Sequence, residues 1–259
     1  MVIGMSIFQK YFAKYSDSFT ILGGAACDEW FSQASLGFRA TKDIDVVLIL
    51  EAKNIAFFEQ LWRFLKDGSY RNWQRSDGTK SFFRFLSPDN QDFPQMIEIL
   101  ARPELVVNVP AGQVIVPIHI DDDISSLSAI LLDEDYYHLI LNNRRISDNG
   151  LPFVIPSALI LLKAKAYLNL IAMRDSGKHI KGDDLRKHRN DIFRLSYLLI
   201  EGDGFQAEGS VINDLKDFLA CFPVGSSEWQ GIQDALRKSR LEVFSIDVLL
   251  GRISNYFGL

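Results

Sequence analysis

Short runs of apolar residues, each bounded by Gly, Pro or Asp, dominate the first 120 residues of the chain. Runs of this length with such boundaries are typical of strands in a buried sheet. The predicted strands are Phe19–Leu22, Ile44–Leu50, Ser81–Leu86, Met96–Leu100, Leu105–Val109 and Val114–Ile120. Helical spacing fits Ala25–Gln33 and Asn54–Leu65 between them. This alternation predicts an α/β (α+β) structure, in which helices flank one mixed sheet.

From residue 125 onward the apolar positions recur every three or four residues, which is the period of an amphipathic helix. The predicted helices are Ser125–Leu132, Tyr136–Asn142, Pro156–Arg174, Asp184–Leu199, Val211–Phe222, Trp229–Leu236 and a last one from Ser245 to the end. Such a series predicts a C-terminal helical bundle. We therefore expect an α/β domain over residues 1–122 and a helical domain over residues 123–259 that completes the active-site cleft.

The composition is that of an ordinary globular protein, with 259 residues, 47% of them hydrophobic and 24% charged, and a formal net charge of -5. Two cysteines are too few for a disulfide scaffold, which favours the cytoplasm as the location. We expect no membrane span, because Lys163 and Lys165 interrupt the most apolar stretch, Ser157–Ala172. Collagen-like and disordered chains are excluded by the same composition.

The segment that points to chemistry joins a predicted strand to a glycine pair, Gly23 and Gly24, and continues after a helix-length gap into Asp43-Ile-Asp45. Two glycines let the backbone approach a ligand closely, and the amides that open the next helix favour an anion such as phosphate. Side chains two apart in a strand share a face, so Asp43 and Asp45 point the same way. Paired carboxylates of this kind suit Mg²⁺, which takes oxygen ligands and is often shared with substrate phosphates.

A third acid, Glu98, lies in the predicted strand Met96–Leu100, where charged residues are rare. If this strand neighbours the one that carries the aspartates, three carboxylates converge on one edge of the sheet. Such a cluster could hold one or two Mg²⁺ ions and activate an attacking hydroxyl. The alternative is an ion pair of Glu98 with Arg84 or Arg102 across the sheet.

These motifs resemble the nucleotidyltransferase superfamily, in which a Gly-Gly or Gly-Ser precedes Asp-x-Asp and a third acid on a later strand. The closer likeness is to the AbiEii/AbiGii toxin-like nucleotidyltransferases. The matching residues are Gly23, Gly24, Ala26, Arg39, Thr41, Asp43, Ile44 and Asp45, then Pro156, Leu159, Lys163 and Ala166, then Lys187, His188, Asp191 and Ile192. The chain departs from the pattern in Glu98, where Asp is more usual, and in His188, where an acid is frequent.

The resemblance implies a nucleotidyltransferase-like fold and Mg²⁺-dependent transfer of a nucleoside monophosphate from an NTP to an acceptor hydroxyl of RNA, such as a tRNA end, or of a protein. It makes Asp43 and Asp45 metal ligands and Glu98 a ligand or general base. It also implies that Lys163 contacts the triphosphate and that Asp191 completes the site. The residues that it assigns to nucleotide binding are Gly23, Gly24, Arg39, Thr41 and Lys187. A cognate antitoxin is a further possible partner.

The charge distribution favours an anionic ligand at the helices independently of the resemblance. Residues 163–194 carry nine basic side chains and four acidic ones, a local charge of +5, which leaves -10 on the rest of the chain. Lys163 lies among leucines and therefore needs a partner, either phosphate or an acid. Two alternatives stay open. The acceptor could be a small molecule such as an antibiotic, because an acidic surface suits a cationic drug, or the site could be an inactive nucleotide-binding module.

Overall fold

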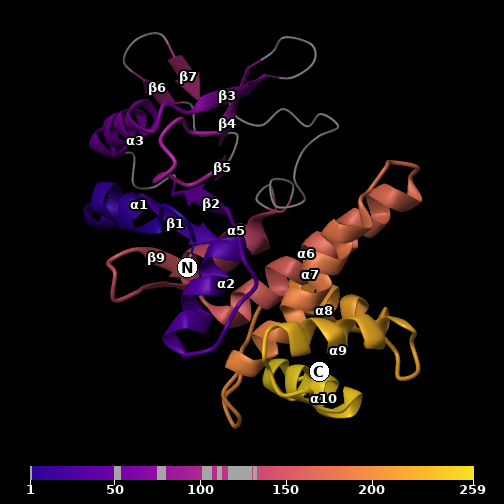
Figure 1. Ribbon diagram of the computed structural model, residues 1–259. Coiled ribbons are helices and arrows are strands. Elements are labelled where there is room, and N and C mark those ends of the chain that lie inside the picture. The colour runs from indigo at the N-terminus through magenta and orange to yellow at the C-terminus, as the bar shows by residue number, and fades with distance from the viewer. Residues whose placement is uncertain are drawn as a thin grey trace. The chain divides into compact units, whose positions relative to one another are not determined.

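The computed structural model describes residues 2–49, 54–74, 80–100, 107–109, 113–115, 130 and 133–259. It is a mixed α/β structure, as expected, and divides into two compact units (Figure 1). The sheet unit comprises Met1–Glu29, Ala40–Asp122 and Asn143–Val154, and the helical unit comprises Trp30–Arg39, Asp123–Asn142 and Ile155–Leu259. The predicted domain boundary at 122/123 lies outside the described residues, as does the predicted helix at 125–132 apart from Ile130, which is helical and buried.

The sheet unit is built on a seven-stranded mixed sheet in the order β3-β4-β5-β2-β1-β9-β8. Its strands are β1 (Phe19–Leu22), β2 (Asp43–Leu48), β3 (Arg71–Gln74), β4 (Lys80–Leu86), β5 (Met96–Leu100), β8 (Arg144–Ile146) and β9 (Pro152–Val154). The pairs β2–β5 and β1–β9 are parallel, and the other neighbours are antiparallel. A separate ribbon joins β6 (Val107–Val109) to β7 (Gln113–Ile115).

Two short segments lie in the other unit from the one in which the sequence pattern placed them. Asn143–Val154 adds β8 and β9 to the sheet unit, whereas the pattern gave everything after residue 122 to helices. Three-residue strands show no period of two, so pairing with a distant strand decides their conformation. Trp30–Arg39 belongs to the helical unit although it lies early in the chain. One of its packing partners, Asp191, is remote in sequence and bonds to Arg39.

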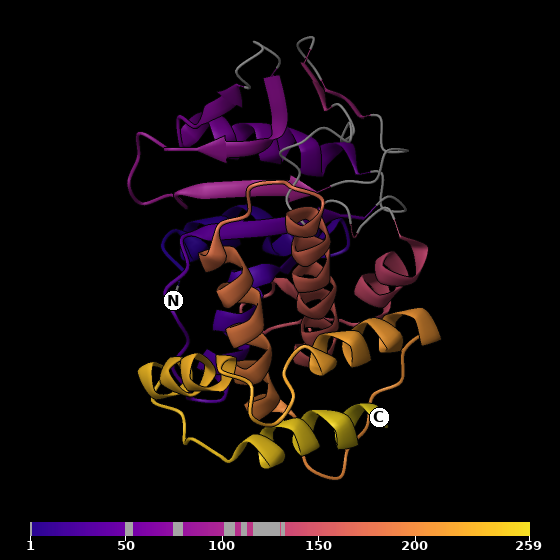
Figure 2. The same cartoon turned by 90° about the vertical axis from the view of Figure 1, so that its right-hand side faces the viewer.

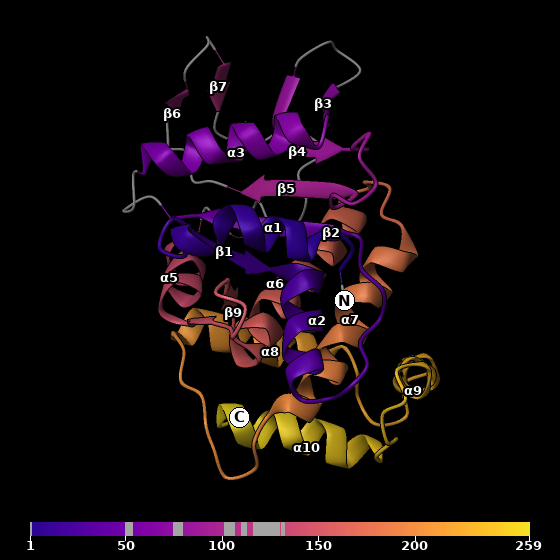
Figure 3. The same ribbon diagram turned by 60° about the vertical axis from the view of Figure 1, so that its left-hand side comes forward.

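One face of the sheet is covered by α1 (Met5–Phe12) and α3 (Ile55–Asp67), which run in front of the strands in Figure 3. Strand register places Phe19, Ile21 and Val46 on this face. Aromatic rings fill the layer: the centroids of Phe19 and Phe57 are 5.6 Å apart, and those of Trp62 and Phe85 are 6.4 Å apart. These pairs bury the apolar stripe of α3, and the contacts of Phe8 and Phe12 with Phe19 do the same for α1. Strand register places Asp45, Glu98 and Arg84 on the opposite face.

The helical unit is organised around α6 (Pro156–Asp175), which packs against α7 (Gly182–Leu195) and α8 (Gly209–Ala220). Figure 2 shows α6 and α7 side by side. The remaining helices are α5 (Glu134–Asn142), α9 (Glu228–Lys238) and α10 (Ile246–Phe257). A second aromatic cluster, in which the rings of Phe193 and Trp229 lie 5.0 Å apart, fills the space between α7 and α9. The helical pattern of the sequence is thus realised with boundaries shifted by a few residues.

By length and composition α6 would suffice to cross a membrane, and among the described helices it alone meets that criterion. Half of its apolar window is buried inside the protein, however. Lys163, in the middle of this helix, has 4% of its surface exposed and is therefore also covered by protein. The core helix of a globular unit has these properties, because neighbouring helices cover much of its apolar surface.

Candidate functional site

Four positions of the sheet unit form a row on the face opposite α1 and α3, which we call the carboxylate row: Gly23, Asp45, Glu98 and Arg84. Leu22, the residue before Gly23, pairs with Asp45, which pairs with Glu98 in the parallel ladder of β2 and β5. Glu98 in turn pairs with Arg84 of β4. Register partners share a face, so Asp45, Glu98 and Arg84 lie side by side. Asp43 adds a third carboxylate on that face two residues along β2.

The backbone of Gly23 lies directly against the carboxylate of Asp45. Gly23 has a φ of +67° and begins α2 (Gly23–Gln33) directly after β1. A Cβ atom at this position would lie 1.8 Å from Oδ2 of Asp45, which is far inside van der Waals contact. Only glycine accommodates both the left-handed conformation and this approach. The positive end of the α2 dipole favours the negative charge of Asp45 beside it. The first glycine of the pair is therefore required by the fold at this corner.

Glu98 is the most buried of the charged members of the row, with 8% of its surface exposed. The guanidinium Nη2 of Arg84 donates a hydrogen bond of 3.2 Å to Oε1 of Glu98. A buried carboxylate needs such a partner, because an uncompensated charge in the interior costs several kcal/mol. Of the two arginines that the sequence offered, Arg84 is the one that the structure pairs with Glu98, and Arg102 lies outside the described residues.

The acids of the carboxylate row match the ligands that a divalent ion prefers only in part. Asp43 and Asp45 are half-buried neighbours on one face, and Mg²⁺ is commonly held by one or two carboxylates together with waters and substrate phosphates. Across the part of the chain that the structure describes, no group of three or more His, Cys, Asp or Glu side chains is arranged to hold a metal. Within the row, Glu98 is hydrogen-bonded to Arg84. The residues therefore fit an ion held by the two aspartates.

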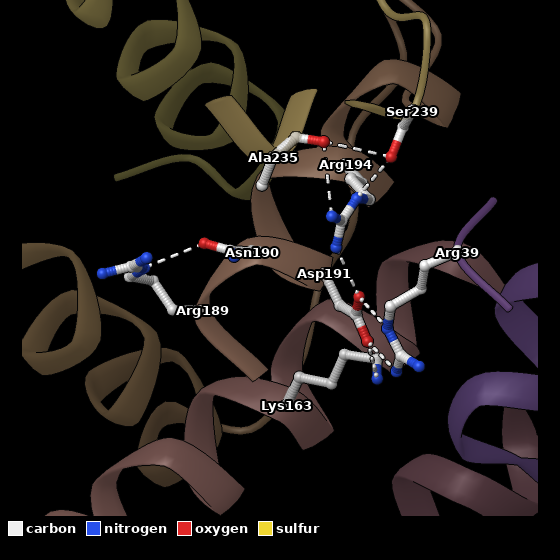
Figure 4. A network of polar contacts seen from close by, with 8 residues as sticks. All are labelled: Arg39, Lys163, Arg189, Asn190, Asp191, Arg194, Ala235 and Ser239. Carbon is white, nitrogen blue, oxygen red and sulfur yellow. Dashed lines mark hydrogen bonds and ion pairs between the residues drawn. The ribbon is translucent and has the colours of Figure 1, made fainter. Parts of the chain in front are cut away.

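The helical unit contains a buried ion-pair cluster centred on Asp191, which we call the cation cluster (Figure 4). Asp191 of α7 is fully buried. Its Oδ1 accepts hydrogen bonds of 2.9 Å from Arg39 Nε and from Arg194 Nη1. Its Oδ2 accepts one of 2.7 Å from Arg39 Nη2 and one of 2.9 Å from Lys163 Nζ. Three cations thus share a single carboxylate.

The surroundings of Asp191 hold it in the charged form. Burial alone raises the pKa of its carboxyl, but the charge of Lys163 and the hydrogen bonds from Arg39 and Lys163 outweigh burial, so the pKa lies well below its ordinary value. The ring of Phe38 makes cation–π contacts with two of these cations. Its centroid lies 5.2 Å from Cζ of Arg39 and 6.0 Å from Cζ of Arg194. Arg194 also donates to Ser239 Oγ at 2.8 Å.

His188 lies beside this cluster on α7 and is neutral. Burial and the charge of Lys163 lower the pKa of its imidazole to about 3. Within the described part of the chain, its Nδ1 is buried and has no hydrogen-bond partner. A neutral ring therefore lies beside the cluster at this position, where an acid would compete with Asp191 for the same cations.

The predicted site residues divide between the two units. In the sheet unit the structure brings together Gly23, Asp43, Asp45 and Glu98, with Gly24 in the first turn of α2 and Thr41 half-buried just before β2. In the helical unit it brings together Arg39, Lys163 and Asp191, whereas Lys187 is exposed on α7.

The partner that Lys163 needed is an acid, one of the two options that the sequence offered. Sequence reasoning missed Arg194 as a partner of Asp191, although a spacing of three residues in a helix signals such a pair.

The chain matches no family model, no curated protein and no solved structure. The resemblance to nucleotidyltransferases therefore depends on the motif residues and on where the fold places them. Two placements bear on it: the glycine pair lies at the junction of β1 and α2, and the aspartates lie on β2, adjacent to β1.

Proposed function

We propose that this protein is a Mg²⁺-dependent nucleotidyltransferase of the AbiEii/AbiGii toxin-like type, with a nucleotidyltransferase-like sheet. It moves a nucleoside monophosphate from an NTP to the hydroxyl of an RNA or protein acceptor and releases pyrophosphate. The carboxylate row supports this proposal most directly: Gly23 lies against Asp45, and Asp45 lies in register with Glu98. A glycine corner at a helix N-terminus beside two carboxylates offers sites for a phosphate and a cation together.

Under this proposal Asp43 and Asp45 hold the magnesium ion, which supplies charge stabilisation for the transferring phosphoryl group when bound. Gly23 and Gly24 let the triphosphate approach the amides of α2. Glu98 sets the local charge through its pair with Arg84. Arg39, Thr41 and Lys187 are proposed to bind the nucleotide, as the motif implies, and Lys163 to contact its triphosphate.

Asp191 takes a narrower role in this proposal than the motif alone implied. Its side chain has no exposed surface and accepts hydrogen bonds from three cations, so it is a positioning residue for Lys163 and Arg39. Of these two, Arg39 is the more accessible, with 23% of its side chain exposed against 5% for Lys163. A cation that is fixed in place by a buried acid loses little entropy when it binds a phosphate.

The proposal is tested by incubating the protein with Mg²⁺, each of the four labelled NTPs and cell RNA or protein. We expect label in a macromolecular fraction, and we expect Asp45→Asn to abolish it, because the substitution removes the charge that holds the ion. Asp89→Asn is the matched control, since this acid is 65% exposed and belongs to a surface ion pair with Arg71. Equal labelling by the wild type and Asp45→Asn would contradict the proposal.

A second function, nucleotide binding without catalysis, is favoured by one observation: Arg84 already neutralises Glu98, the third acid of the motif. Both functions require that the protein bind an NTP, but only a nucleotidyltransferase labels an acceptor. A ligand that binds only the folded state raises the melting temperature. An NTP-dependent rise together with no labelling of any acceptor would support this second function.

A further inference from the structure

Arg194 of α7 joins the cation cluster to the last turn of α9, a helix beyond the residues that carry the motif resemblance (Figure 4). Its Nη1 donates a hydrogen bond of 2.9 Å to Oδ1 of Asp191. Its Nε donates to Oγ of Ser239 at 2.8 Å, and its Nη2 donates to the carbonyl oxygen of Ala235 at 3.3 Å. The Ser239 hydroxyl itself donates to the same carbonyl at 3.1 Å. Arg194 is thereby held at the C-terminal end of α9, where the helix dipole favours a cation.

Burial keeps Arg194 away from a ligand in solvent. Arg194 is 6% exposed and Ser239 is 8% exposed. The segment that leads to Arg39 passes the same turn of α9, because a Cβ atom on Gly37 would lie 3.6 Å from the carbonyl oxygen of Ser239. An effect of Arg194 on ligand binding must therefore pass through its neighbours.

Two contacts lead from Arg194 to Arg39. Oδ1 of Asp191 accepts both from Arg194 Nη1 and from Arg39 Nε at 2.9 Å, so the two guanidinium groups converge on one oxygen. The ring of Phe38 lies near both groups, with its centroid 6.0 Å from Cζ of Arg194 and 5.2 Å from Cζ of Arg39. Arg39 differs from Arg194 in having 23% of its side chain exposed. A displacement of Arg194 would therefore disturb two groups that orient the more accessible cation.

We propose that Arg194 is a positioning residue for Arg39. The last turn of α9 fixes Arg194, which in turn fixes the oxygen and the ring that hold the Arg39 guanidinium in place for a phosphate of the nucleotide. Arginine suits this role because its planar fork of donors can serve a carboxylate, a hydroxyl and a carbonyl at once. The inference rests on the proposed function and adds to it a role for the C-terminal helix α9.

Two substitutions loosen this contact to different degrees. Arg194→Lys keeps the positive charge, but an ammonium group cannot reproduce the fork that spans Asp191, Ser239 and Ala235. Ser239→Ala removes only the hydroxyl that accepts from Nε of Arg194. The serine variant keeps every charge of the cluster, so it decides the question if Arg194→Lys fails to fold.

Each variant has a matched control in the helical unit. Arg189→Lys is the control for the arginine, because Arg189 is 4% exposed on α7 and pairs with Glu228 at the start of α9. Ser196→Ala is the control for the serine, because the Ser196 hydroxyl is buried and donates to the carbonyl oxygen of Phe193 at 2.8 Å. A general loosening of α7 against α9 would affect the controls as well.

The first measurement follows the Nε–H resonance of Arg39 in ¹H–¹⁵N spectra without nucleotide. A proton that is hydrogen-bonded to a buried carboxylate exchanges slowly with water and gives a separate signal, which Arg39→Met identifies by its loss. We expect this signal to shift or broaden in Arg194→Lys and Ser239→Ala and to stay as in the wild type in both controls.

The second measurement is the affinity for the α,β-methylene analogue of each NTP by titration calorimetry. We expect the dissociation constant to rise about tenfold in Arg194→Lys and about threefold in Ser239→Ala, with changes below about 1.5-fold in the controls. Because Arg194 acts through Arg39, the double variant Arg39→Met/Arg194→Lys should bind no more weakly than Arg39→Met alone.

An Arg39 signal or a nucleotide affinity that both Arg194→Lys and Ser239→Ala leave unchanged would overturn the inference. Equal losses in Arg189→Lys, or additive losses in the double variant, would overturn it too. The failure of the proposed function has a different signature. A wild-type chain that binds no analogue contradicts the nucleotidyltransferase assignment, whatever the Arg39 signal does, and the inference then falls with it.

Discussion

The sheet unit and the helical unit each bring acids and bases together, but with opposite balance. In the carboxylate row three acids share one face with one arginine, and Asp43 and Asp45 stay half-buried. In the cation cluster one acid, Asp191, is fully buried under three cations. Among the described members of the row acids outnumber bases, whereas the one acid of the cluster is bonded to three cations. The surroundings of Asp43 and Asp45 thus differ from those of Asp191, although all three are aspartates of the same motif set.

This comparison separates two kinds of candidate residue. An acid that is partly exposed and outnumbers its basic neighbours can bind a metal. An acid that is fully buried and outnumbered by cations holds those cations in place, and its removal leaves like charges facing one another. The comparison predicts that substitution of Asp191 in the cluster acts mainly on stability and that substitution of Asp43 or Asp45 in the row acts mainly on ligand binding.

The largest effect is expected from Asp191→Asn. The substitution keeps the size of the side chain but leaves the charges of Arg39, Lys163 and Arg194 without their common counter-ion. We expect the free energy of unfolding to fall by about 3–5 kcal/mol, as is usual when one member of a buried pair is removed. Urea unfolding followed by the fluorescence of the tryptophans measures this change.

Asp183→Asn is the control for this prediction, because Asp183 lies on the same helix and pairs with Arg186, yet its side chain is 88% exposed. Surface pairs contribute little, so we expect a change within about 0.5 kcal/mol. Similar effects of the two substitutions would show that the cation cluster contributes no more than a surface ion pair.

Gly23→Ala tests the close approach at the carboxylate row. A methyl group at this position must adopt a φ of +67° and displace the Asp45 carboxylate, so we expect a loss of about 3 kcal/mol from strain and overpacking. Gly177→Ala has a φ of +91° but meets nothing within 4 Å, so only strain of about 1 kcal/mol applies. Thermal unfolding of the two variants isolates the contact with Asp45. Equal losses would argue against it.

The smallest effect concerns the pH dependence of stability. The pKa of His188 is about 3 in the folded chain against 6.5 as its ordinary value, so between these values the unfolded state binds more protons. The free energy of unfolding therefore falls as the pH drops from 7 to 5, by about 2 kcal/mol from this group. Asp191, whose folded pKa is lowered, adds a further loss only below about pH 4.

His188→Gln should abolish this loss between pH 7 and 5, whereas His179→Gln, at an exposed position, should leave it in place. Urea unfolding at both pH values for the three proteins gives the comparison. A pH dependence in His188→Gln equal to that of the wild type would place its origin elsewhere in the chain.

The sequence predicted the elements that show a recognisable pattern of apolar residues within their own length. Phe19–Leu22 and Met96–Leu100 are strands with the predicted bounds, and the long helices α6 and α7 lie where apolar spacing put them. It did not predict α1, β3, β8 or β9. Strands β8 and β9 have only three residues each, and β9 joins the sheet by pairing with β1, which is remote in sequence. Register across β1, β2 and β5 likewise came only from the fold.

The sequence by itself determined that Asp43 and Asp45 share a face, since side chains alternate along any strand, and that a glycine pair precedes a helix. Only the tertiary structure decided which cation meets which acid. Arg39 and Asp191 are 152 positions apart, and Arg84 reaches Glu98 through a strand pairing that local pattern does not specify. Charge neutralisation acts over a few ångströms in space, so the fold assigns the partners of a buried carboxylate.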